Sequence, residues 1–312
     1  MKKYKKRRFV RDGCIHVYQR SVNGFNLFYD SEDFIVFYTI VSVLSKHYKV
    51  RLMGMCLMID HVHILVSADS IDDISSFVRH FTSLFVLEFN HDIGRKGPLF
   101  HKSFGSAPKQ GGKKIRSAIV YVGNNPVEKN ICDRAEQYRW NFLAYLDCVA
   151  PFSEYIPFRK SSGMLKKAMK EVRIMTVSNR YLTYAQVRRL LGSVDGNERE
   201  FLIDYMIAGY YPFDKDALLS YYDSVEDMRI AMKSTAGSEY DIKEQYYSGT
   251  DVVYYGMMNV VRRDFHIEPV KKVIALPLSQ KIAIARFLQK KMPVSAFQIL
   301  KFLHLKPNCD DV

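Results

Sequence analysis

The order of apolar and polar residues predicts alternating strands and helices over the first half of the chain. Residues 14–29 are β-branched and aromatic on both sides of Asn23-Gly24, a pair typical of tight turns, and so predict a β-hairpin. Residues 50–59 and 61–68 are two apolar runs joined by a single residue. Such a short connection indicates an antiparallel pair of strands.

Three longer segments have the apolar spacing of helices. Residues 31–49 and 70–90 both carry acidic residues in their first turn, where the helix dipole favours negative charge. Residues 113–126 predict a third helix, which we expect to end at its terminal proline. Residues 97–108 follow a glycine boundary and predict another strand before this third helix.

The resulting order is strand, helix, two strands, helix, strand and helix. It predicts an α+β fold of ferredoxin-like type, with an antiparallel sheet, helices on one face and the other face open to a ligand. The pattern changes near Ala150-Pro151, where a polar, proline-containing stretch reads as a linker. We therefore expect a first domain over residues 1–150 and a mainly helical domain over residues 151–312.

Two features of the helical part are relevant to binding. A stretch of capping-box form, residues 183–186, begins a helix that carries Arg188 and Arg189. Residues 278–305 predict two short helices around a proline. This string fits a helix-turn-helix that binds DNA and equally fits helices that pack against the first domain.

Charge favours a nucleic acid as the partner. The 312 residues carry a formal net charge of +13 with a pI near 9.3, more than an acidic small substrate requires. The N-terminus forms a basic arm, which is either a phosphate-binding segment or a solvated tail. Its cationic residues are Lys2, Lys3, Lys5, Lys6, Arg7, Arg8 and Arg11.

The composition disfavours several other classes of protein. No apolar run approaches the roughly 18 to 20 residues of a membrane span, and no apolar signal region follows the basic start, so we expect a cytoplasmic protein without membrane contact. The five cysteines are scattered and form no CxxC pair. This pattern argues against a disulfide framework and against a structural zinc site.

Two histidines stand out in the run "MCLMIDHVHILVSAD". Side chains alternate faces along a strand, so His61 and His63 share one face. On spacing alone the pair fits metal ligands, a general acid and base, or a simple surface lining. A metal site needs further ligands, and a catalytic site needs a nucleophile.

The helix predicted at 113–126 offers both a further metal ligand and a nucleophile. Tyr121 and Asn125 lie four residues apart and so share one helical face. The Asn125 amide oxygen is a hard ligand that would complete a His-His-oxygen site for Mg²⁺ or Mn²⁺. The Tyr121 phenol can act as a covalent nucleophile towards a metal-polarised phosphodiester, although a tyrosine on an amphipathic helix is more often a core residue.

The paired motifs resemble those of the single-tyrosine HUH transposases, the insertion-sequence-200-like group, and most closely their REP-associated branch. In that family a His-hydrophobic-His strand precedes a helix with Tyr-x-x-x-Asn-Pro-Val, followed by Tyr-x-Trp. The matching residues here are 61–63, 121–127 and 138–140, and the resemblance covers roughly residues 10–147.

The resemblance implies a ferredoxin-like nuclease domain that cleaves and rejoins single-stranded, hairpin-marked DNA through a 5′-phosphotyrosine intermediate. It implies that Tyr121 is the nucleophile, that His61 and His63 bind the metal with help from Asn125, and that the protein works as a homodimer. C-terminal extensions in this group would recognise the DNA end or stabilise the dimer.

The sequence departs from the family pattern at two positions. Asp60 stands where the family usually has asparagine, and Glu128 removes positive charge near the expected DNA path. The Asp60 carboxylate would either tune the metal site or turn away from it, and neither change replaces one of the four candidate site residues. The competing interpretation is a non-catalytic or domesticated nucleic-acid-binding protein of the same fold.

Overall fold

The computed structural model describes residues 8–233 and 251–306. Its centre is a four-stranded antiparallel sheet in the order β2-β3-β1-β4. The strands are β1 (Gly13–Arg20), β2 (Arg51–Leu57), β3 (His61–Ser67) and β4 (Gly105–Gln110). With α1 between β1 and β2 and α2 between β3 and β4, this order is that of a ferredoxin-like fold. The predicted fold class is confirmed.

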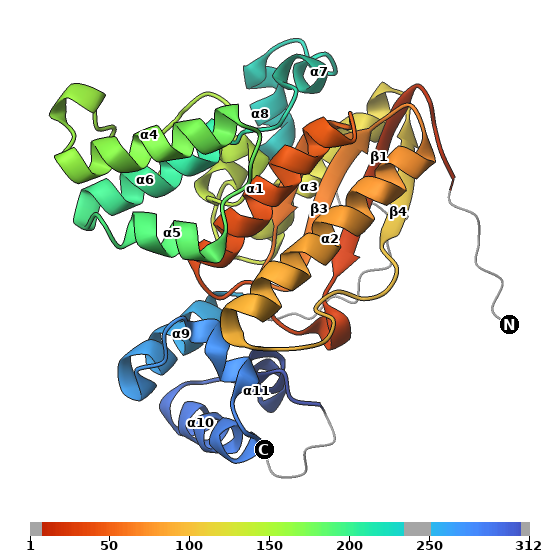
Figure 1. The fold of residues 1–312 in the computed structure, drawn as a ribbon. Helices are drawn as coiled ribbons and strands as arrows, with labels where there is room; N and C mark the ends of the chain where they lie inside the picture. The colour runs from red at the N-terminus through yellow and green to blue at the C-terminus, as the bar shows by residue number, and fades with distance from the viewer. Residues whose placement is uncertain (1–7, 234–250, 307–312) are drawn as a thin grey trace, which may run out of the picture.

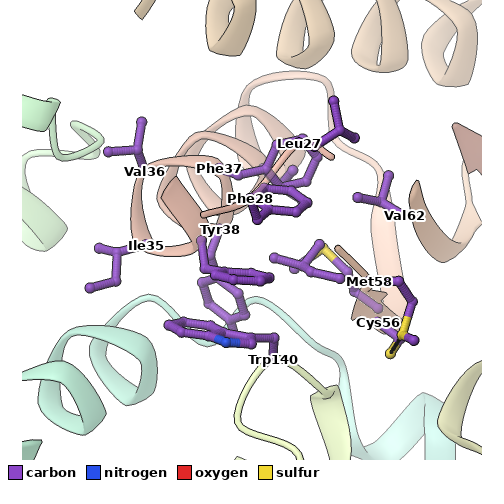
Figure 2. Close-up of a cluster of buried hydrophobic side chains, with 14 of the residues drawn as sticks. Leu27, Phe28, Ile35, Val36, Phe37, Tyr38, Cys56, Met58, Val62 and Trp140 are labelled. Carbon is purple, nitrogen blue, oxygen red and sulfur yellow. Dashed lines mark hydrogen bonds between the residues drawn. The ribbon is translucent and has the colours of Figure 1, made fainter. Parts of the chain in front are cut away.

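Helices α1 (Ser31–His47) and α2 (Ile71–Ile93) lie side by side across one face of the sheet (Figure 1). Between them and the sheet is an aromatic core in which Phe28, Phe37 and Val62 meet, closed at one end by Trp140 (Figure 2). The other face, expected to be open, is crossed by α3 (Gly112–Glu128), which contacts all four strands. The site residues on that face are therefore covered by a helix.

Two local predictions are wrong. Residues 14–29 do not form a hairpin: after the turn at Asn23-Gly24, the backbone N–H groups of Leu27 and Phe28 donate to the Ile59 carbonyl instead of to β1. The strand expected over 97–108 begins only at Gly105, since the preceding residues make an isolated bridge at Phe100.

Helix α3 also differs from its prediction, since it continues through Pro126 to Glu128. Pro126 lies in the last turn, where its missing N–H removes a single hydrogen bond. The position of the proline therefore does not set the end of the helix.

The described part of residues 151–306 contains helices and no strand, as predicted. In Figure 1, α4 to α6 lie beside α1, α7 and α8 lie near the upper end of the sheet, and α9 to α11 lie below its lower end. None of the described helices has both the length and the apolar character that a membrane span requires. The helices are α4 (Gly163–Val177), α5 (Tyr184–Leu191), α6 (Gly196–Gly209), α7 (Lys215–Leu219), α8 (Val225–Lys233), α9 (Val252–Phe265), α10 (Leu278–Lys291) and α11 (Ala296–Leu303), with short 3-10 turns that include η5 (Val270–Ala275).

Candidate active site

Strand β3 places the two histidines on the face of the sheet that α3 covers. His63 pairs with Tyr18 of β1, and His61 pairs with Arg20, so all four side chains have the same parity. The imidazole rings of His61 and His63 are perpendicular, with centroids 4.9 Å apart. Both rings can therefore approach one small ion or one phosphate group.

Helix α3 brings Tyr121 against this pair within the same chain. The phenol ring lies edge-on to His63, with centroids 5.5 Å apart, and is equally far from the ring of His16. Tyr121 is 4% exposed and His63 is fully buried. His63 and Tyr121 are 58 positions apart in the sequence. They are neighbours because β3 and α3 pack face to face.

Asn125 lies one helical turn after Tyr121 and is buried. Its amide nitrogen donates to the Tyr121 carbonyl oxygen over 2.9 Å, so the carboxamide is turned back onto its own helix. The amide NH₂ group is then engaged, and Oδ1 is the atom of this side chain with the chemistry of a metal ligand.

Each candidate histidine is held at Nδ1 by a second side chain. The Asp60 carboxylate accepts from His61 Nδ1 over 2.5 Å, and His63 Nδ1 lies 2.9 Å from His16 Nε2. Metal-binding histidines typically have one ring nitrogen fixed in this way, which orients the other. A cation would therefore be bound through the two Nε2 atoms.

His16 is a site residue that the sequence reasoning missed. It comes from the middle of β1 and is fully buried, and burial lowers its pKa well below the ordinary value, with further lowering from His63 and Lys109. The ring therefore stays neutral at pH 7. The sequence does show that His16 lies two residues before Tyr18, on the same face of its strand. This position points to the site only when the pairing of β1 with β3 is known.

Asp60 has a second partner, Lys301 of α11, which forms an ion pair with the other carboxylate oxygen. Burial opposes ionisation of Asp60, but Lys301 and His61 outweigh it and hold the pKa of this carboxyl well below its usual range. Nearby, burial and the charge of Asp60 raise the pKa of Asp251 to about 6. Asp60 is thus a fixed carboxylate between the histidine pair and the C-terminal helices.

These residues fit a divalent cation as a partial ligand set. Two imidazoles and one amide oxygen suit a small cation, whose remaining positions would be filled by water and a phosphate oxygen. Within residues 8–233 and 251–306, no group of three or more His, Cys, Asp or Glu side chains has the geometry of a metal site. A protein-only cage is therefore not formed by the described residues.

The family assignment follows from the sequence match. Residues 15–125 match the family model described as "Transposase IS200 like", a span that begins just before His16 and ends at Asn125. This segment belongs to the IS200-like transposase family.

The family assignment rests on the match to this model alone. The solved structure of a REP-associated tyrosine transposase bound to a REP hairpin has 17% sequence identity and a TM-score of 0.39, covering 46% of this chain and 84% of that chain. No curated protein matches the chain.

The predicted binding residues of α5, Arg188 and Arg189, pair with carboxylates outside the histidine pair. Arg188 forms ion pairs with Glu32 and Asp92, and Arg189 pairs with Glu171. Arg188 therefore joins α5 to α1 and α2 of the ferredoxin-like fold, whereas Arg189 joins α5 to α4 within the helical region. Of the basic arm, Arg8 and Arg11 are exposed, and Lys2, Lys3, Lys5, Lys6 and Arg7 lie outside the described residues.

Proposed function

We propose that this protein is a transposase-type endonuclease that cleaves and rejoins single-stranded, hairpin-marked DNA through Tyr121. The observation that carries the proposal is the meeting of Tyr121 with the histidine pair in a segment of the IS200-like transposase family. The reaction class is that of a covalent nucleophile attacking a phosphodiester.

In the proposed reaction the Tyr121 oxygen forms a bond to phosphorus as the bond to the 3′ oxygen breaks. The products are a 5′-phosphotyrosine and a free 3′-OH, and a second 3′-OH can reverse the step to join strands. Mg²⁺ or Mn²⁺ held by His61, His63 and Asn125 would polarise the phosphate. The energy of the broken phosphodiester is kept in the protein-DNA bond, so joining needs no other energy source.

The phenol must lose a proton during the attack, because an ordinary tyrosine has a pKa of about 10. The His16 ring lies beside the phenol, with ring centroids 5.5 Å apart. With His63 bound to the cation through Nε2, its Nδ1 donates to His16 Nε2, so the neutral His16 ring carries its proton on Nδ1 and does not take the proton of Tyr121. The proton balance of the proposed step closes because the leaving 3′ oxygen takes up a proton as Tyr121 loses one.

The DNA path is proposed to follow the start of α3. Lys113, Lys114 and Arg116 are exposed in its first turns, ahead of Tyr121 on the same helix. Cationic side chains at this place can contact phosphates on either side of the cleaved bond. Tyr121 and His63 are almost completely buried. Entry of a DNA strand therefore requires the segments of the protein that cover them to move.

The test is covalent capture. Labelled single-stranded hairpin DNA from the flanks of the gene is mixed with protein and Mn²⁺ or Mg²⁺, then resolved on a denaturing gel. Wild type should give a denaturant-resistant adduct, and Tyr121→Phe should give none while still binding DNA. Tyr48→Phe is the matched control, since its hydroxyl contacts His80 at the end of α1, away from the site.

Substitution of the histidines tests the metal role separately. His61→Ala and His63→Ala should each lose metal-dependent cleavage, and unchanged cleavage in either would contradict that role. Binding of hairpin DNA by wild type without adduct would favour the alternative, a non-catalytic nucleic-acid-binding protein. The division into domains 1–150 and 151–312 and the homodimer remain parts of the proposal that size measurement and limited proteolysis can test.

A further inference from the structure

The C-terminal helix α11 reaches the start of β3, directly beside the histidine pair. Its Lys301 side chain is 10% exposed and ends at the Asp60 carboxylate. The ammonium group also lies 5.2 Å from the centre of the Tyr254 ring, a cation-π contact with α9. Helix α11, supported by α9, therefore contacts Asp60, the residue adjacent to His61.

Independent contacts hold α11 in this place. The Tyr29 hydroxyl donates to the Phe302 carbonyl over 2.5 Å, and His304 Nε2 lies 2.7 Å from the Asn26 carbonyl oxygen. The same segment, residues 25–30, donates two backbone N–H groups to Ile59, the residue before Asp60. Both ends of the Lys301–Asp60 pair are thus tied to one segment of the transposase fold.

Asp60 divides its two oxygens between two partners. Oδ1 accepts from His61 Nδ1, and Oδ2 pairs with Lys301. A carboxylate with both oxygens engaged cannot rotate without losing one contact. The direction of its bond to His61 therefore depends on the position of Lys301.

We propose that Lys301 is a positioning residue for His61, acting through Asp60. This inference rests on the proposed function, in which His61 binds the metal. An Asp60 acceptor keeps the proton on His61 Nδ1 and leaves the Nε2 lone pair for the cation. Lys301 locks the acceptor in that orientation, so the helical extension completes the nuclease site.

The pairing depends on aspartate, and not asparagine, at position 60. An asparagine would place an NH₂ group or a single oxygen between His61 and the Lys301 ammonium, and could not accept from both with separate oxygens. Only a carboxylate at position 60 can accept from His61 with one oxygen and pair with Lys301 through the other.

The experiment compares full-length wild type with Lys301→Met, Lys301→Arg, Asp60→Asn and the Lys301→Met/Asp60→Asn double variant. Mn²⁺ affinity is measured by titration without DNA, and the ¹⁵N signals of the His61 ring report its tautomer without metal. Lys306→Met, an exposed lysine just after α11, is the control.

Lys301→Met and Asp60→Asn should each weaken Mn²⁺ binding about tenfold, as loss of an outer partner of a metal-binding histidine does. The double variant should be no weaker than Asp60→Asn alone, and Lys301→Arg should keep most of the affinity. The His61 tautomer should be single in wild type and mixed in Lys301→Met.

Two results would overturn the inference: wild-type Mn²⁺ affinity and tautomer in Lys301→Met, or losses that simply add in the double variant. If Lys301→Met does not fold, Lys301→Arg and Asp60→Asn carry the comparison. A wild type that binds no Mn²⁺ counts against the proposed function alone, because the tautomer measurement still decides whether Lys301 positions His61.

Discussion

Replacing Lys271 by methionine should destabilise the protein strongly. Lys271 belongs to η5 and is about 1% exposed, and its Nζ lies 2.8 Å from Asp33 Oδ1 and 2.9 Å from Asp92 Oδ2. The ammonium group also lies 3.1 Å from the centre of the Tyr184 ring. Lys271→Met keeps the length of the side chain and leaves both carboxylates without their shared cation.

The magnitude follows from the partners that remain. Removing one member of a buried ion pair costs about 3 to 5 kcal/mol. Asp33 still accepts from the Tyr184 hydroxyl, and Asp92 still pairs with Arg188, so the lower end, about 3 kcal/mol, applies. At about 2 °C per kcal/mol for a chain of this size, the Tm should fall by about 6 °C.

The assay is urea and thermal unfolding followed by circular dichroism, with Lys272→Met as the matched control. Lys272 is the exposed neighbour whose Nζ donates to the Glu268 carbonyl, so its loss should change stability by less than about 0.5 kcal/mol. If Lys271→Met lowers the free energy of unfolding no more than Lys272→Met does, the buried carboxylates Asp33 and Asp92 do not depend on Lys271, and the reasoning is refuted.

Three further predictions concern pH, packing and charge. Burial lowers the pKa of His304 from 6.5 to about 3, so the ring stays neutral in the folded protein while it takes up a proton in the unfolded chain below pH 6.5. The free energy of unfolding should therefore fall by about 2 kcal/mol between pH 7 and pH 5, a difference that His304→Asn should remove in unfolding measured at both pH values. Gly105→Ala would place a Cβ 1.8 Å from the Tyr18 ring and should cost about 1 to 3 kcal/mol, whereas Gly112→Ala, with nothing within 4 Å, should be nearly neutral in the same assay. Deleting residues 1–8 should reduce the salt dependence of DNA binding, by about one unit of slope per lost phosphate contact, and an unchanged slope would identify the arm as a solvated tail.

The sequence by itself determined the elements whose signal is local. Helical spacing and acidic first turns located α1 and α2, and the period of two placed His61 and His63 on one face. The distance of four residues placed Asn125 one turn after Tyr121. These predictions hold because each depends on residues that are neighbours along a single strand or helix.

Local patterns failed where distant backbone decided the outcome. Residues 25–30 have the composition of a strand, yet they bond to Ile59 and support α11 instead of pairing with β1. Nothing within that segment encodes the competing partner. Residues 97–104 also have the composition predicted for a strand, but β4 begins only at Gly105.

The tertiary structure alone decided which side chains complete the site. His16 meets His63 from another strand, and Lys301 meets Asp60 from a helix at the opposite end of the chain. Such contacts join positions that no spacing rule connects, because they arise only when separate elements bury their apolar faces together. The histidine pair and the Tyr121–Asn125 pair are each local in sequence, whereas their meeting and their orientation are properties of the packed molecule.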